Sequence, residues 1–369
     1  MADEYHFGSL HFFPLDVNNP NIFGFSEFLA ALALMVLAWN LTDVRYRFRI
    51  RIAPLPLRQV TFYVIVAVGV LTLLTDLWYA EQWLVPQGHL VSPSQWQAFL
   101  GGIFLLTFLS WAWFAFIRPP IYSKWNAARY AETIYGFIVQ GDPSVLPVIA
   151  NELTRSTTAL IKLAPEKDGP YHRNAQRNKP KHTYLQETAI NFANDILLMI
   201  ADKRFCRTIV ESSPHTAWTI FYNILETKKY GVNIDVFARN IFNAAIMNKD
   251  SFLFHESHGY DSGLIGFQKP ISNAMFSCHK MVETIGTILD PDISNMRKWD
   301  ADQWEAYSRA TLMTFKDYVD KDFWNHSFVL HNAKGHIQHA ASELYKINGT
   351  SQTWDADVLS RLRVSVKFI

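Results

Sequence analysis

The sequence predicts a mainly α-helical membrane protein, with a three-helix transmembrane region followed by a cytoplasmic all-α helical domain. Three observations lead to this fold class: three long apolar segments near the N-terminus, a one-sided distribution of Lys and Arg, and helical periodicity after residue 118. The chain has 369 residues, and with 49% hydrophobic residues it is too apolar to be disordered. A net charge of +1 argues against a nucleic-acid-binding protein, and two cysteines cannot form a disulfide framework.

The three apolar segments have the length of membrane spans, at about 25–42, 61–80 and 98–117. A helix rises about 1.5 Å per residue and needs about 20 apolar residues to cross the hydrocarbon layer. Three buried helices of a soluble core are the alternative, but such helices rarely lack Lys and Arg so completely. The sequence therefore predicts three transmembrane helices.

The basic residues predict the orientation of these spans, because cytoplasmic loops carry an excess of Lys and Arg. All basic residues before residue 118 lie in the first loop: Arg45, Arg47, Arg49, Arg51 and Arg58. We expect these arginines to contact anionic lipid. The predicted domains are an extracytoplasmic segment (1–24), a transmembrane region (25–118) and a cytoplasmic helical domain (119–369). The predicted location is the cell membrane, multi-pass, with the N-terminus outside.

Apolar residues at helical spacing continue through the cytoplasmic domain, for example at Ile190, Asn194, Leu197 and Ala201. Nine helices are predicted: 122–139, 143–163, 184–201, 203–211, 215–228, 234–247, 270–289, 301–319 and 323–347. Antiparallel pairs of the α-solenoid kind are one arrangement, although no repeat of fixed period occurs.

Two short segments, residues 45–52 and 361–369, alternate between basic or polar and apolar residues. A period of two is typical of a strand with two different faces. We therefore predict a small β-ribbon formed by the two segments, with two unrelated edge strands as the alternative.

A cluster of metal-ligand residue types occurs at His255, Glu256, His258 and Asp261. Imidazole and carboxylate are ligands that divalent cations accept, but the spacing is not that of an HExxH helix. The alternative is a loop whose polar side chains cap the neighbouring helices. No other cofactor is predicted.

The segment from Arg177 to His182 resembles the RNxxxH motif of HEPN ribonucleases, helical nucleases in which the Arg and His act on RNA. The resemblance is limited to six residues that include Pro180. It implies Arg177 and His182 as candidate catalytic residues, and a solvated basic loop is the alternative.

Two acidic residues, Glu27 and Asp76, lie within the predicted spans. Acidic groups in a membrane are costly and often functional, but both lie near the outer boundary, where water can hydrate them. Four histidines near the C-terminus, at positions 326, 331, 336 and 339, suit a pH-sensitive helix or an ordinary surface.

The leading functional hypothesis is an oligomeric membrane protein whose cytoplasmic domain senses a signal or binds a protein partner and acts on the spans, as a channel or membrane-perturbing effector. In layout, a few spans joined to a soluble domain, the chain resembles membrane-acting effectors of bacterial antiphage defence. A membrane-tethered metal-dependent hydrolase or nuclease and a membrane-anchored scaffold are the alternatives. The absence of a recognised catalytic motif favours a protein without enzymatic activity.

Overall fold

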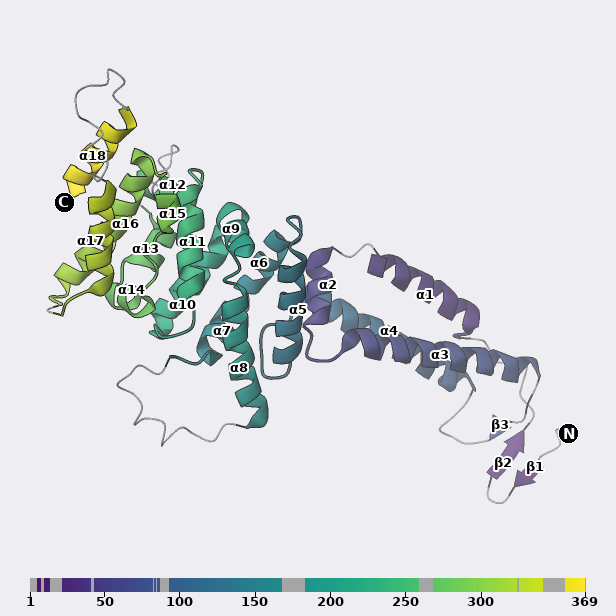
Figure 1. Ribbon diagram of the computed structural model, residues 1–369. Coiled ribbons are helices and arrows are strands. Elements are labelled where there is room, and N and C mark those ends of the chain that lie inside the picture. The colour runs from purple at the N-terminus through teal and green to yellow at the C-terminus, as the bar shows by residue number, and fades with distance from the viewer. Residues whose placement is uncertain are drawn as a thin grey trace. The chain divides into compact units, whose positions relative to one another are not determined.

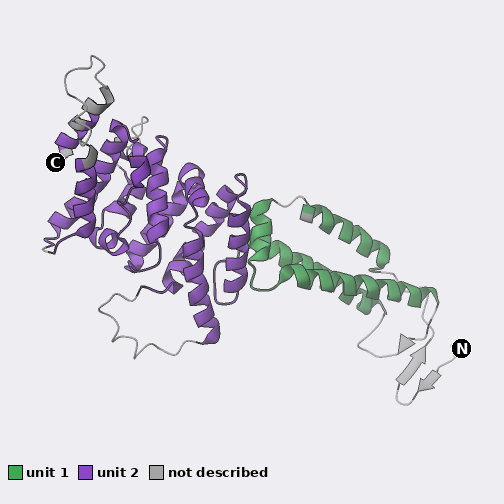
Figure 2. Cartoon of the chain, viewed as in Figure 1, with its two compact units in different colours: residues 1–120 green, residues 121–369 purple. Residues whose placement is uncertain are grey.

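In the computed structural model the chain forms two compact units, residues 1–120 and residues 121–369 (Figures 1 and 2). The structure describes residues 5–7, 10–13, 22–40, 43–81, 83, 85–86, 93–167, 183–258, 268–296, 298–323, 325–340 and 356–368. These residues are mostly helical, which confirms the mainly α fold class.

Unit 1 contains four α-helices, a π-helical segment and three short strands among its described residues. The elements are β1 (Tyr5–Phe7), β2 (Leu10–Phe13), α1 (Phe25–Asn40), α2 (Val44–Arg51), α3 (Leu57–Ala80), β3 (Val85–Pro86), α4 (Pro93–Ala112) and η1 (Trp113–Ile117). The strands pair antiparallel in the order β1-β2-β3.

Two helices in the described part of the chain are long and apolar enough to cross a membrane, Leu57–Ala80 and Ser94–Ile117. They correspond to the second and third predicted spans. The first predicted span forms α1, which has 16 residues and a length of roughly 24 Å, shorter than a hydrocarbon layer of about 30 Å. Three spans are therefore not confirmed, whereas two apolar helices that could span a membrane are.

The helices of unit 1 pack around a small core and leave much apolar surface outside. Phe28 and Met35 of α1 pack against Val68 of α3 and against Leu100 and Phe104 of α4. Within the apolar 18-residue stretch of each long helix, only 22% is buried inside the structure. Most of their large apolar side chains therefore lie at the surface.

The predicted β-ribbon is wrong, because both of its segments are helical. Residues 45–51 belong to α2, and residues 361–368 belong to α18 (Ala356–Phe368). Alternation over eight residues is too short to exclude a helix, and α2 buries the consecutive residues Phe48, Arg49 and Ile50 against its neighbours. A helix also satisfies its own backbone hydrogen bonds, whereas a strand needs a partner.

Unit 2 is a succession of helices that stand side by side (Figure 1). Those before α18 are α5 (Ala127–Gln140), α6 (Leu146–Thr154), α7 (Thr157–Leu163), α8 (Tyr184–Met199), α9 (Lys203–Ser212), α10 (Pro214–Thr227), α11 (Asp235–Met247), α12 (Phe252–His258), α13 (Pro270–Phe276), α14 (His279–Ile285), α15 (Ile293–Met296), α16 (Ala301–Asp320) and α17 (Phe328–Ala340). Most contacts join helices close in sequence, such as α5 with α8 and α9 with α11.

Local signals explain where several helices begin and end. Asp202 accepts hydrogen bonds from the backbone N–H groups of Arg204 and Phe205 and so caps the start of α9. Asp300 and Gln303 form a capping box at the start of α16. Gly141 ends α5 in a left-handed conformation (φ 64°) that glycine adopts readily. Two predicted helices, 143–163 and 270–289, are each divided into two.

Candidate functional sites

The five arginines of the first predicted loop lie in different environments, from buried to exposed. Arg49 is buried, its Nη1 donates to the carbonyl oxygen of Ala115 in η1 at 3.0 Å, and its guanidinium lies 5.5 Å from the centre of the Tyr46 ring. Arg47 and Arg58 are exposed. Arg45 is half-buried and Arg51 is exposed. Arg49 therefore contributes to the packing of unit 1.

The structure brings Glu27 and Asp76 together at the start of α1. Asp76 lies on α3, and its Oδ2 accepts a hydrogen bond from the backbone N–H of Phe25 at 2.8 Å. Glu27 Oε2 accepts from the N–H of Gly24 at 3.0 Å and from Ser26 Oγ at 2.9 Å. The N–H groups of a first helical turn lack partners within the helix. Both carboxylates thus stabilise the beginning of α1.

Glu256 is a buried cap of α13. Its Oε1 accepts from the N–H of Ile271 at 3.1 Å and its Oε2 from the N–H of Ser272 at 2.7 Å. His255 is exposed, whereas the side chain of His258 and all of Asp261 lie outside the described residues. No group of three metal-ligand residues occurs in the described part of the chain. The metal site stays a prediction, and the Glu256 carboxylate already has partners for both oxygens.

The RNxxxH segment, with Arg177 and His182, lies outside the described residues, so its catalytic role stays a prediction.

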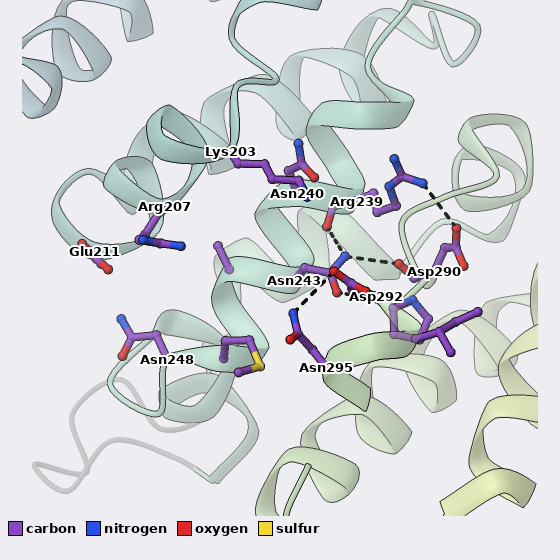
Figure 3. Close-up of a pocket in the computed structure, with 14 residues that line it drawn as sticks. Lys203, Arg207, Glu211, Arg239, Asn240, Asn243, Asn248, Asp290, Asp292 and Asn295 are labelled. Atoms are coloured by element: carbon purple, nitrogen blue, oxygen red, sulfur yellow. Dashed lines mark hydrogen bonds and ion pairs between the residues drawn. The ribbon is translucent and has the colours of Figure 1, made fainter. Parts of the chain in front are cut away.

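Unit 2 also presents a polar hollow of about 760 Å³ (Figure 3). It is lined by residues of α9, of α11 and of the segment from Asp290 to Asn295. The contributing side chains come from three separate parts of the sequence. No linear motif could have predicted the hollow, although Asp290, Asp292 and Asn295 give the 290–295 segment a polar sequence.

Asparagine side chains hold the walls of this hollow together (Figure 3). Asn243 Nδ2 donates to the carbonyl oxygens of Arg239 at 2.8 Å and Asp290 at 3.3 Å, and its Oδ1 accepts from the N–H of Asp292 at 2.8 Å. On the other wall, Asn240 Nδ2 donates to the carbonyl oxygen of Ala201 at 2.7 Å. These amides fasten the 290–295 segment and the connection between α8 and α9 to α11.

The hollow carries charges of both signs. Lys203 and Arg207 lie on α9 and form no ion pair with a carboxylate in the described ranges, while Arg239 lies 4.0 Å from Asp290. Hydrogen bonds from the hydroxyl and N–H of Ser294 lower the pKa of Asp292, and the charges of Lys203 and Arg239 act in the same direction. Asp292 is therefore ionised at neutral pH, and the hollow suits a polar ligand or partner.

A Ser–His–Glu set occurs where α14 meets the start of α17. His279 Nε2 lies 3.0 Å from Ser327 Oγ, which donates to Glu283 Oε2 at 2.6 Å. Glu283 also accepts from the N–H groups of Phe328 and Val329, at 3.0 and 3.3 Å. In a catalytic triad the acid orients the second nitrogen of the histidine, but His279 Nδ1 is buried without a hydrogen-bond partner in the described structure. The set is a helix cap rather than a triad.

Acid conditions should destabilise unit 2 through His279. Burial lowers its pKa below the ordinary 6.5, although the charges of Glu283 and Asp317 oppose this shift. The unfolded chain then binds a proton near pH 6.5 that the folded chain does not, so stability is complete above that pH and falls below it. We expect H279Q to reduce the fall in Tm between about pH 7.5 and about pH 5. Equal pH profiles for H279Q and the wild type would contradict this assignment.

No protein-family model matches the chain, and no curated protein or solved structure matches it either.

Proposed function

We propose that the chain is an integral membrane protein in which unit 1 lies in the bilayer and unit 2 is a cytoplasmic binding unit. The observation that carries this proposal is the apolar surface of α3 and of α4 with η1. Phe62, Tyr63 and Leu106 are 62%, 70% and 66% exposed. Soluble monomers rarely expose large contiguous apolar patches, and a lipid bilayer would cover this surface.

The charges at the two ends of unit 1 support one orientation. The arginines of α2 and Arg58 lie near the start of α3, and Arg118 follows η1, whereas Glu27 and Asp76 lie at the start of α1 and near the end of α3. By the positive-inside rule the arginine end is cytoplasmic. We assign α1 as a third, shorter membrane segment that packs along α3.

The exposed arginines Arg47 and Arg58 fit contact with anionic headgroups at the cytoplasmic surface. Each basic residue close to such a surface contributes about 1 kcal/mol of attraction. Arg49 is excluded from this role in our proposal because it donates to Ala115 inside unit 1.

Unit 2 would receive a ligand or partner in the polar hollow and so influence the spans. The volume of about 760 Å³ falls within the range of roughly 300–1,000 Å³ that is typical of ligand sites. Lys203 and Arg207 are available there to bind anionic groups.

Membrane integration and orientation can be tested on the full chain. We expect the protein to stay in the membrane fraction after alkaline carbonate extraction. For orientation, C278S removes the half-buried thiol and leaves Cys206, which is fully buried. In this background W83C should react with a membrane-impermeant maleimide on intact cells, and L55C only after permeabilisation.

Both substituted positions are exposed, at 46% for Trp83 and 57% for Leu55. A failure to react with the maleimide would therefore reflect protection by the membrane rather than burial in the protein. Release of the chain by carbonate would overturn the membrane proposal. Labelling of L55C from outside would overturn the orientation alone.

A further inference from the structure

A second cavity in unit 2, a groove of about 440 Å³, lies between α16 and α17. The two helices run antiparallel, because the hydroxyl of Tyr307 near the start of α16 lies 2.9 Å from Nδ1 of His336 near the end of α17. The hydroxyl of Tyr318 donates to the carbonyl oxygen of Asn325 at 3.0 Å and fastens the connection between them. The groove is thus formed by one helical hairpin.

The walls of the groove are largely apolar. Leu312 and Phe315 of α16 face Leu330 and Ile337 of α17 across it. Leu312 is 41% exposed and Phe315 is 47% exposed, which is unusual for large apolar side chains of a packed helix pair. An apolar molecule in the groove would remove this surface from water.

The polar side chains that line the groove include one lysine, two histidines and several hydroxyl groups. Lys334, His326 and His331 line it, no carboxylate does, and Lys334 forms no ion pair with any residue that the structure describes. The hydroxyl of Ser308 is buried in the wall and has no hydrogen-bond partner within the described residues. A buried hydroxyl without a partner is costly, and a bound acceptor would satisfy it.

We propose that this groove binds a small amphiphilic carboxylate. Its apolar body would pack on Leu312, Phe315 and Leu330, and its anionic group would pair with Lys334. Charge complementarity favours this class, because the exposed ammonium of Lys334 attracts an anionic group and repels a cation, and no carboxylate lines the groove to compete for it. The inference goes beyond the membrane function proposed above and does not depend on it.

The test uses the full chain in lipid nanodiscs and labelled octanoate in equilibrium dialysis, with empty nanodiscs subtracted. We expect saturable binding of one octanoate per chain, with octanamide a much weaker competitor. K334Q should weaken binding by about tenfold or more, because it removes one charge-assisted contact. K316Q on the same hairpin is the matched control, since Lys316 is exposed and does not line the groove.

F315S removes part of an exposed wall and should weaken binding severalfold without unfolding the helix pair. Equal affinity for octanamide, or unchanged octanoate binding by K334Q, would overturn the proposal. No saturable binding, together with a smaller oligomeric mass for F315S, would instead identify the groove as a contact between two copies of the chain and would equally overturn it.

Discussion

Replacing Glu256 with alanine is expected to destabilise unit 2 by about 3 kcal/mol and to lower its Tm by roughly 6–12 °C. Glu256 is only 1% exposed, and its two carboxylate oxygens accept hydrogen bonds from the N–H groups of Ile271 and Ser272. Without the carboxylate, these two buried donors lose their partners. Thermal unfolding of the full chain in detergent measures the loss.

The local reason for this loss can be tested separately. In E256A the amides of Ile271 and Ser272 should exchange hydrogen for deuterium faster than in the wild type, whereas amides of α5 should not change. E256Q keeps one acceptor oxygen and should retain part of the stability. E226A, at an exposed position on α10, is the control and should stay within about 0.5 kcal/mol of the wild type.

A chelator distinguishes the cap from the metal site that the His255–Asp261 cluster suggests. If Glu256 acts only as a cap, the chelator leaves the wild-type Tm unchanged. If it also binds a divalent ion, the chelator lowers the wild-type Tm and has no effect on E256A. The cap and the metal-site interpretations of Glu256 thus predict different effects of the chelator on the wild-type Tm.

Much of the helical architecture could be predicted from the sequence, because long periodic segments and caps are local signals. The predicted helix 215–228 and the apolar spacing around Leu197 coincide with α10 and α8. The division of the 270–289 helix could not be predicted in this way. His279 begins α14 with its N–H bonded to Asp317 Oδ2, a residue 38 positions further along the chain.

The sites were harder to predict, because their geometry depends on contacts between distant segments. Glu256 looked like a metal ligand in the sequence, and its cap partners lie 15 and 16 residues away. The hollow joins Lys203, Asn243 and Asp292, which no short motif contains. The alternation of 45–52 favoured a strand because sequence alone does not show that α2 packs against η1.

Replacing Arg49 with methionine is expected to destabilise unit 1 by about 2 kcal/mol, while R47M and R58M have little effect in neutral lipid. The carbonyls of a last helical turn lack partners within the helix, and Arg49 supplies one for Ala115 near the end of η1. A cation is also favourable at a helix C-terminus. Methionine keeps an apolar stem but donates no hydrogen bond, so thermal unfolding in nanodiscs should show the difference among the three variants.

The lipid composition of the nanodiscs separates this internal role from headgroup contact. If Arg49 stabilises η1, the loss in R49M is the same in neutral and in anionic lipid, because its partner is a backbone carbonyl at 3.0 Å. If all five arginines contact headgroups alike, R49M, R47M and R58M lose similar stability, and only in anionic lipid. R49K should fall between R49M and the wild type, because lysine keeps the charge and lacks the planar guanidinium that lies over Tyr46.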